Sequence, residues 1–254
     1  MRNPVRRNRN IGTPQQGYGR NNKLTIPSLL ADERSFCERL GSYEKTDKVI
    51  NEHTFTFITE EARLPLSHAC TVNDVERMIS YIPPADYGSL KFIVFRQPRR
   101  KEEIISPVWG RLRYAYLFEK EIFPAVLLES VDCTKTIRWK RSLTPEDLAE
   151  LNRLQDDGHH FEPDKRGYNL VPEISNVRNT QLYRTLLHEF GHYVQYLNVV
   201  ERPGEDDDLE AWEKRNDYYT SIPKNIKEQF AHRYADTLMN ALKEQGLIPF
   251  ERAE

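Results

Sequence analysis

Hydrophobic residues recur along the chain in three zones, which predict helices first, strands next and long helices last. In the first zone, the apolar positions indicate a helix over 28–40, with a serine at its start and a glycine after its end. A second helix is expected to begin near Asn73, with its apolar residues on one side. It should end at Pro83 and Pro84, because a residue that precedes proline disfavours helical geometry.

The second zone carries strand patterns. Residues 90–95 form an almost continuous apolar run, which is typical of a strand buried on both faces. Residues 111–118 alternate in character, which predicts a half-exposed strand at the edge of a sheet. The expected apolar face of that strand comprises Leu112, Tyr114, Tyr116 and Phe118. Shorter strands are expected at 54–58, 125–128 and 136–140.

The third zone is mainly helical. The threonine and proline at 144–145 are typical of a helix start. Residues 156–178 contain two glycines and two prolines and are interpreted as a loop. A long helix is expected over 180–199, a short one around 209–212 within an acidic stretch, and a last one over 223–244. Helix, then mostly strand, then helix predicts the α+β class.

Composition divides the chain into a tail and one domain. Residues 1–25 are rich in Arg, Asn, Gln and Gly, with almost no apolar content, so we expect a disordered, Arg-rich tail. Residues 26–254 are enough for one domain, with an N-terminal α/β lobe over 26–200 and a helical C-terminal lobe over 201–254. The tail could bind nucleic acid, although a solvated tail is the commoner role of such a segment.

Net charge and cysteine content limit the partners and the cellular compartment to be expected. The net charge of −2 gives no overall field that would select nucleic acid or an anionic membrane. No stretch approaches the roughly 18 apolar residues that a membrane span needs. The three cysteines are odd in number and form no CxxC pair, which favours a reducing compartment. With no apolar run that would serve as a secretory signal, we expect a cytoplasmic location. A chain exported by a signal-independent route would have the same features.

The segment His188-Glu189-Phe190-Gly191-His192 lies in the long helical pattern and has the spacing of a metal site. Residues four apart share one helix face, so His188 and His192 can bind the same zinc ion. Glu189 lies about 100° around the helix, where it would act as general base on a water at the ion's open position. Gly191 weakens the helix and is expected where another segment, such as a strand holding substrate, approaches closely.

A catalytic zinc site needs a third protein ligand, for which Glu228 is the best candidate. It shares a helical face with Ala231 and Ala235, and a carboxylate on an apolar stripe should be paired or ligated. The alanines would let this helix pack close to the histidine helix. His232, one turn beyond, could instead be the third ligand, an outer partner or a transition-state hydrogen-bond donor. The histidines at 159–160 are not expected to hold a second ion.

This motif, followed by a helix that carries Glu228, resembles the zincin metallopeptidases, and the glutamate makes it similar to their gluzincin branch. The resemblance covers residues 180–245. It implies a zincin-like fold, in which a small mixed or antiparallel sheet from strands within 90–140 packs on the active-site helix, followed by a helical C-terminal lobe. Gluzincins often have an aspartate four residues after the third ligand; here His232 takes that place, and Asp236 comes one turn later.

The resemblance implies hydrolysis of peptide bonds in a protein or peptide substrate, with one zinc ion per chain and Glu189 generating the nucleophile. A protein group would stabilise the oxyanion, and Tyr218, Tyr219 and His232 are the candidates for it.

Two other interpretations stay open. In one, the chain is a regulatory or binding protein on a zincin scaffold, with residues 1–25 on nucleic acid. Salt-sensitive binding that is lost when these residues are deleted would support it. In the other, the chain is a secreted effector or toxin peptidase with one dedicated target, and broad cleavage of unfolded protein would argue against it.

Overall fold

A computed structural model describes residues 35, 37–99, 108–204 and 209–253. The chain divides into two units, Met1–Phe36 and Cys37–Glu254, and the architecture below is that of the second unit. The expected tail over 1–25 and residues 28–34 and 36 of the helix expected over 28–40 lie outside the described residues. The described part of that helix is wrong, because residues 35 and 37–40 form turn and irregular structure.

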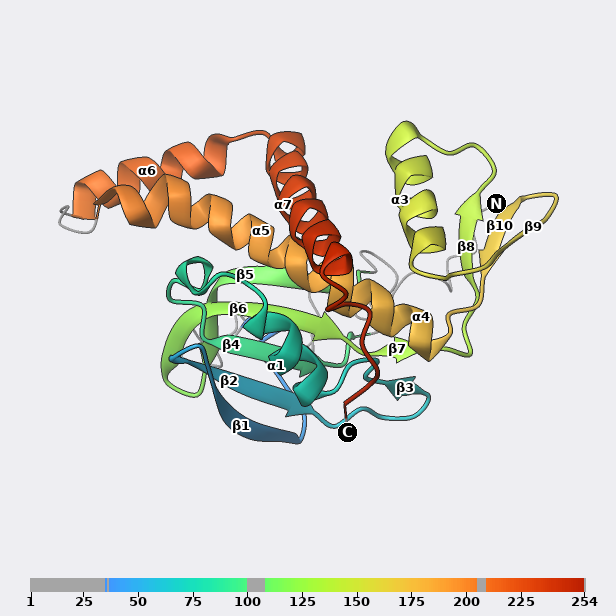
Figure 1. Ribbon diagram of the computed structural model, residues 1–254, viewed down its shortest axis with the longest axis horizontal. Helices are drawn as coiled ribbons and strands as arrows, with labels where there is room; N and C mark the ends of the chain where they lie inside the picture. Colours follow the sequence, from blue (N-terminus) through green and yellow to red (C-terminus); the bar gives the residue numbers. More distant parts are fainter. Residues whose placement is uncertain (1–34, 36, 100–107, 205–208, 254) are drawn as a thin grey trace, which may run out of the picture. The chain divides into compact units, whose positions relative to one another are not determined.

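The second unit is built on a mixed five-stranded sheet in the order β1-β2-β4-β6-β5 (Figure 1). The pairs β2–β4 and β4–β6 are parallel, whereas β1–β2 and β5–β6 are antiparallel. The central strand β4 is buried throughout and β5 lies at an edge, as the sequence predicts for both. The strands are β1 (Tyr43–Ile50), β2 (His53–Glu60), β4 (Phe92–Arg96), β5 (Gly110–Phe118) and β6 (Glu121–Glu129).

The apolar face expected for β5 is wrong in one respect, because the strand changes faces along its length. Its pairing with β6 shifts register between Arg113 and Tyr116, which is a β-bulge. As a result, Leu112 packs on one face of the sheet, whereas Tyr116 and Phe118 are buried on the other. Simple alternation cannot foresee this change, since one inserted residue moves every later side chain to the opposite face.

Helix α1 (Val72–Ser80) begins where the sequence predicts and is closed by a reciprocal cap. Thr71 accepts a hydrogen bond from the Asp74 N–H at 3.0 Å, and the Asp74 side chain accepts one from the Thr71 N–H at 3.1 Å. Helix α3 (Pro145–Asp156) has the same arrangement at Thr144. Both starts were readable locally because the capping groups are three residues apart in sequence.

The loop predicted over 156–178 is wrong, because this segment contains regular structure. Strands β9 (Phe161–Pro163) and β10 (Gly167–Leu170) form a small sheet with β8 (Ile137–Lys140), and α4 (Ile174–Asn179) follows. The pairing partner of β10 lies some thirty residues earlier, so local glycines and prolines concealed it. A further two-stranded sheet joins β3 (Leu66–Ser67) to β7 (Val131–Asp132).

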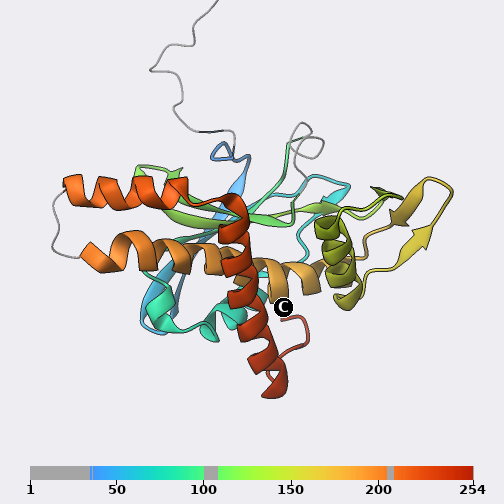
Figure 2. The ribbon, with the colours of Figure 1, turned by 90° about the horizontal axis from the view of Figure 1, so that it is seen from above.

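The long helix expected over 180–199 is present and starts earlier. Residues 174–201 form one continuous helical run in which α5 (Leu186–Tyr196) lies between two π-helical stretches, η3 (Thr180–Thr185) and η4 (Leu197–Glu201). Helix α6 (Leu209–Ser221) is longer than the short helix expected there. Helix α7 (Lys224–Glu244) then crosses α5 (Figure 2).

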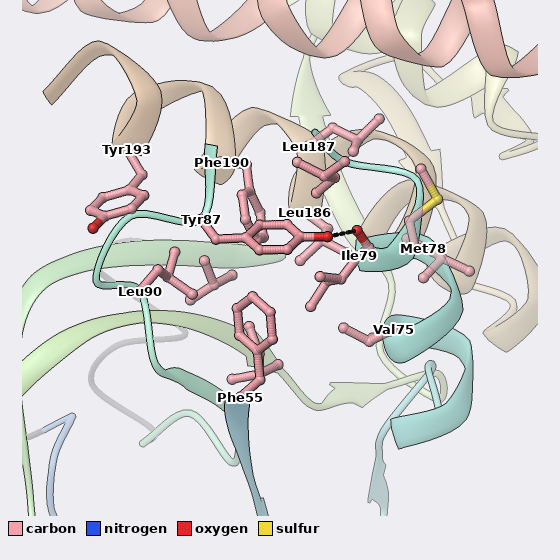
Figure 3. Packing of buried hydrophobic residues seen from close by; sticks show 14 of the residues in the cluster. Phe55, Val75, Met78, Ile79, Tyr87, Leu90, Leu186, Leu187, Phe190 and Tyr193 are labelled. Atoms are coloured by element: carbon pink, nitrogen blue, oxygen red, sulfur yellow. Dashed lines mark hydrogen bonds between the residues drawn. The ribbon is translucent and has the colours of Figure 1, made fainter. Parts of the chain in front are cut away.

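The main hydrophobic core lies between one face of the sheet and helices α1 and α5 (Figure 3). Phe55 from the sheet, Met78 from α1 and Phe190 from α5 are all fully buried there. The phenolic O–H of Tyr87 donates to the Ile79 carbonyl at 2.8 Å, which satisfies its polar group inside the core. A smaller cluster covers the other face of the sheet. The protein is therefore of the α+β class.

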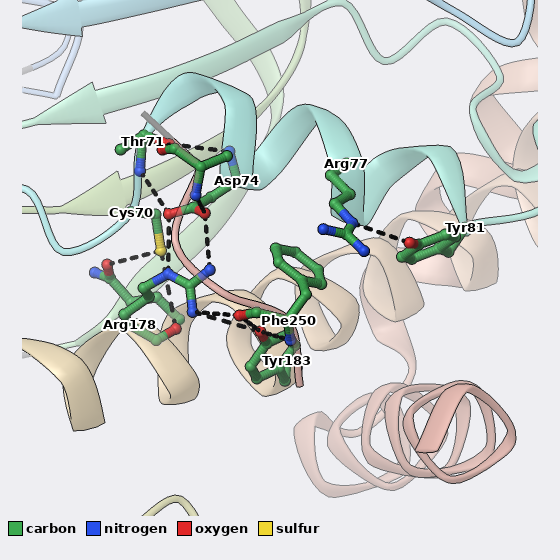
Figure 4. Close-up of polar contacts among 10 residues, drawn as sticks. Cys70, Thr71, Asp74, Arg77, Tyr81, Arg178, Tyr183 and Phe250 are labelled. Atoms are coloured by element: carbon green, nitrogen blue, oxygen red, sulfur yellow. Dashed lines mark hydrogen bonds and ion pairs between the residues drawn. The ribbon is translucent and has the colours of Figure 1, made fainter. Parts of the chain in front are cut away.

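A buried ion pair fastens the C-terminal segment to this core (Figure 4). The Arg178 guanidinium donates to both carboxylate oxygens of Asp74, at 2.8 and 2.9 Å. It also donates to the Phe250 carbonyl, and the Ala253 N–H donates to Asp74. Asp74, Arg178 and Phe250, which are far apart in the sequence, are therefore connected by hydrogen bonds. No disulfide joins the three cysteines among the described residues. Among the described helices, none is long and apolar enough to cross a membrane.

Candidate metal centre

The motif histidines and Glu228 lie together where α7 crosses α5. One carboxylate oxygen, Oε2 of Glu228, is 3.2 Å from Nε2 of His188 and 3.6 Å from Nε2 of His192. All three side chains are partly exposed, so they are open to solvent on one side. The four-residue spacing places the two histidines on one face of α5, and the crossing of the helices brings the glutamate from 36 residues away.

The two distances from Glu228 are those expected between neighbouring ligands of one small ion, although the described ligand atoms that all lie within 4.8 Å of one another are those of His188, Glu228 and His232, without His192. Ligand atoms placed 2.0–2.1 Å from a tetrahedral centre are about 3.3 Å apart, and the two measured distances lie on either side of that value. Two imidazoles and one carboxylate also form a donor set that zinc accepts. His188 departs from the usual pattern in one respect: its Nδ1 is buried without a hydrogen-bond partner among the described residues, whereas ligating histidines usually donate from that nitrogen.

His232 also lies at the cluster. Its ring centroid is 4.4 Å from that of His188, and ligand atoms of His188, Glu228 and His232 all lie within 4.8 Å of one another. Burial, together with the nearby charges of His188 and Arg153, lowers the pKa of His232 to about 4. Four side chains therefore surround the site. The ligand atoms of His232 lie close to those of His188 and Glu228, and Glu228 also lies close to His192.

The close approach of the two helices explains Gly191. A Cβ on this residue would lie 2.9 Å from both the Cα and the carbonyl oxygen of Ala231. Ala231 is fully buried, so the expectation that alanines let α7 pack against the histidine helix is confirmed. The expectation that a substrate strand needs the glycine is wrong, since the backbone of α7 itself occupies that space.

Glu189 is buried and is tied to the edge of the sheet. Its Oε2 accepts a hydrogen bond from the Leu112 N–H at 2.7 Å, next to the β5 bulge. Burial raises the pKa of Glu189, while the charges of His188 and His192 and the Leu112 bond oppose that rise. The sequence cannot reveal this contact, because the donor is a backbone group. The alternating pattern predicts β5 as an edge strand, and only the resemblance to zincins implies that such a strand lies near the helix.

Glu228 is held as an anion by the same contacts that define the cluster. Hydrogen bonds from His188 and then His192 lower the pKa of its carboxyl group well below the usual range, and partial burial opposes the shift. With Glu189 one residue from His188, two carboxylates stand beside the imidazoles. Their negative charge favours a cation at this point.

The other candidates are placed as follows. Tyr219 is buried, and its hydroxyl lies 2.6 Å from that of Tyr114. The same hydroxyl donates to the His192 carbonyl at 3.4 Å, so Tyr219 contacts the backbone of the helix. Tyr218 is 63% exposed. His159 is buried against Trp109 and bonded to Thr180. Among the described residues, no cluster of metal-binding groups includes 159 or 160.

An arginine on the ligand face of the helix was missed at the sequence level. Arg184 lies one turn before His188, and its guanidinium pairs with Glu150 at 2.9 Å and with Asp157 at 2.8 Å. Both partners belong to α3 or the residue after it, so the pair fixes α3 beside the cluster. The signal was a charged residue four positions before the first histidine, on the face that was expected to be functional.

No family model, curated protein or solved structure matches this chain.

Proposed function

We propose that the protein is a zinc-dependent metallopeptidase. The observation that carries the proposal is the position of Glu228, whose Oε2 lies 3.2 Å and 3.6 Å from the Nε2 atoms of two histidines spaced four residues apart. A carboxylate brought to both imidazoles from a separate helix is what a three-ligand site requires. Ordinary surface pairing needs only one partner.

The surroundings support a zincin-like arrangement, as the sequence motif implies. The motif helix α5 packs against one face of the mixed sheet, and the edge strand β5 contacts Glu189. A later helix, α7, contributes the glutamate. We therefore infer a gluzincin-like organisation, with His232 in the position where an aspartate is common.

Each residue has a distinct role in this proposal. His188, His192 and Glu228 would hold the ion. When bound, zinc would supply Lewis acidity, which polarises a peptide carbonyl and lowers the pKa of water. Glu189 would accept the proton of the attacking water at Oε1, because its Oε2 is engaged by the Leu112 N–H. That bond also fixes the carboxylate before substrate arrives.

The test compares zinc content and peptide hydrolysis in purified full-length variants. Zinc is measured by elemental analysis, and hydrolysis by mass spectrometry on a proteome-derived peptide library. The panel is wild type, His188→Ala and Glu228→Ala, with Glu210→Ala as the matched control, since the Glu210 side chain is 75% exposed on α6. We expect one zinc per chain and peptide cleavage in wild type and control, with both lost in the other two variants.

Two results would contradict the proposal. Wild-type protein that takes up no zinc after reconstitution would remove the metal site. One zinc per chain without cleavage of any library peptide would show a zinc-binding protein that is not a peptidase. That result would favour the alternative of a regulatory or binding protein.

A further inference from the structure

A cavity of about 660 Å³ opens directly onto the metal centre. His188, Glu189, Glu228 and His232 form one part of its lining. The rest includes residues of β5, β6, β7, β8, β10, α3 and η3 and of the segments between them. The volume lies within the range of about 300–1,000 Å³ that is typical of ligand sites. A substrate held at the metal centre would therefore have part of its length inside this cavity.

The walls of the cavity are dominated by large apolar side chains. They come from elements far apart in the sequence, which makes the surface invisible to local patterns. The apolar lining comprises Val108, Trp109, Val131, Ile137, Trp139, Leu154 and Leu170. Trp109 and Trp139 contribute two indole rings, whose faces favour contact with aromatic groups.

The charged residues of the lining, outside the metal centre, are already compensated. Glu129 pairs with Arg111 at 3.1 Å and with Arg96 at 3.5 Å. Asp132 pairs with Lys135 at 3.4 Å. The remaining pair is Arg184 with Glu150, at 2.9 Å. None of these lining charges therefore lacks an opposite charge that a substrate group would have to supply, and a charged side chain here would lose hydration without gaining a partner.

The cavity is also held in shape before substrate arrives. The Arg184 contacts to Glu150 and Asp157 fix the middle and the C-terminal end of α3 against the helix that carries the histidines. Trp109 stacks against His159, with ring centroids 5.8 Å apart and planes at 27°. A preformed wall reduces the entropy lost on binding.

We propose that this cavity is the specificity pocket of the enzyme, and that it takes a large apolar side chain, aromatic or long aliphatic, of the residue beside the scissile peptide bond. This rests on the proposed peptidase function for the position of the scissile bond. The preference for an apolar side chain depends only on the residues that line the cavity. Trp109, Trp139 and Ile137 are the residues that determine it.

The first experiment measures binding without zinc or catalysis. The chain has three tryptophans, and Trp212 lies outside the cavity lining, so three indole N–H signals report separately in nuclear magnetic resonance spectra of the ¹⁵N-labelled full chain. Single Trp→Phe variants assign them. The probes are N-acetyl-L-phenylalanine amide and N-acetylglycine amide.

We expect the phenylalanine probe to shift the Trp109 and Trp139 signals and to leave the Trp212 signal unmoved. Its binding should be at least about tenfold tighter than that of the glycine probe, since pocket discrimination by apolar groups reaches 10–200-fold. Equal response to both probes, or shifts confined to Trp212, would overturn the proposal.

The second experiment compares cleavage sites in the peptide library. Wild type should cut beside Phe, Leu, Met, Tyr or Trp. Trp139→Ala should lose most of this preference, and Ile137→Asp should reduce cleavage at apolar sites while circular dichroism shows intact folding. Trp212→Phe is the control and should keep the wild-type profile. Cleavage without apolar preference would overturn the pocket and leave the peptidase function standing. Probe binding at both cavity tryptophans without any cleavage would support the pocket as a binding site and overturn the peptidase function.

Discussion

Gly191 lies so close to Ala231 that a Cβ on the glycine would come within 2.9 Å of the alanine's Cα. These two residues mark the point where α5 and α7 touch through backbone rather than through side chains. Glu228 is one helical turn before Ala231, so the separation at this contact also sets the distance between its carboxylate and the two histidines. The packing of the two helices and the geometry of the histidine–glutamate cluster are therefore coupled at a single position.

Gly191→Ala should destabilise the protein although alanine is the better helix former. The substitution gains about 1 kcal/mol of helix propensity, but overpacking against an unyielding backbone costs about 1–3 kcal/mol. We expect a net loss of up to about 2 kcal/mol in the free energy of unfolding by urea, measured in chelator. Zinc affinity should also fall, because α7 must move away.

The control for this change is Gln229→Ala, at an exposed position on α7. It should alter the unfolding free energy by no more than about 0.5 kcal/mol. A Gly191→Ala protein that is more stable than wild type, with unchanged zinc affinity, would show that the two helices do not meet as described.

Glu189→Gln should separate metal binding from hydrolysis. The amide oxygen can still accept the Leu112 N–H, so the side chain keeps its anchor, but it can no longer take a proton. We expect full zinc content and a loss of about 10²–10⁴-fold in kcat, the usual contribution of a general base. Steady-state kinetics on a peptide chosen from the library checks this. Wild-type turnover in the variant would exclude Glu189 as the base.

Glu228→Gln and His232→Asn should differ in their effect on zinc affinity. Loss of an outer partner of a metal ligand typically costs 10–100-fold in affinity, and loss of a ligand costs more. With Glu228 as third ligand, we expect Glu228→Gln to weaken zinc binding by more than about 100-fold. His232→Asn should stay within about 100-fold. Competition with a chromogenic chelator measures both, and the reverse order would make His232 the ligand.

Removing one partner of the buried Asp74–Arg178 pair should be strongly destabilising. Asp74 is fully buried and Arg178 nearly so, and Arg178→Met would leave the carboxylate without its counter-charge. The expected cost is about 3–5 kcal/mol in the free energy of unfolding. Arg233→Met, at an exposed position on α7, is the control and should change it by less than about 0.5 kcal/mol.

The same pair gives the folded protein a defined sensitivity to acid. Burial alone would raise the pKa of Asp74, but hydrogen bonds from Arg178, the Ala253 N–H and the Thr71 N–H lower it below its ordinary value of 3.8. A lowered folded-state pKa means that this stabilisation is complete above 3.8 and is lost as the pH falls through the folded-state value.

Wild type and Asp74→Asn should therefore differ most in unfolding free energy at neutral pH. The difference should shrink once the pH drops below about 4. Urea unfolding at several pH values measures it, and a difference that stays constant down to pH 2 would contradict the role of Asp74.

The sequence by itself determined the features that depend on neighbours a few residues away. The helix start near Asn73, the cap at Thr144, the buried run of β4 and the shared face of His188 and His192 all follow from local spacing. Hydrogen bonds and side-chain directions repeat with the period of the helix or strand. Glu228 stood out for the same reason, as an acid on an apolar helical stripe.

Only the tertiary structure decided what depends on segments far apart in the chain. The distance from Glu228 to the histidines comes from the backbone contact at Gly191, and the anchor of Glu189 is a backbone N–H at Leu112, which no side-chain pattern encodes. The face change in β5 follows from one bulged position. The apolar cavity gathers its walls from residues between 98 and 232. Such contacts are set by packing between segments that are far apart in the sequence, and local periodicity identifies the buried face of an element without identifying the segment that covers it.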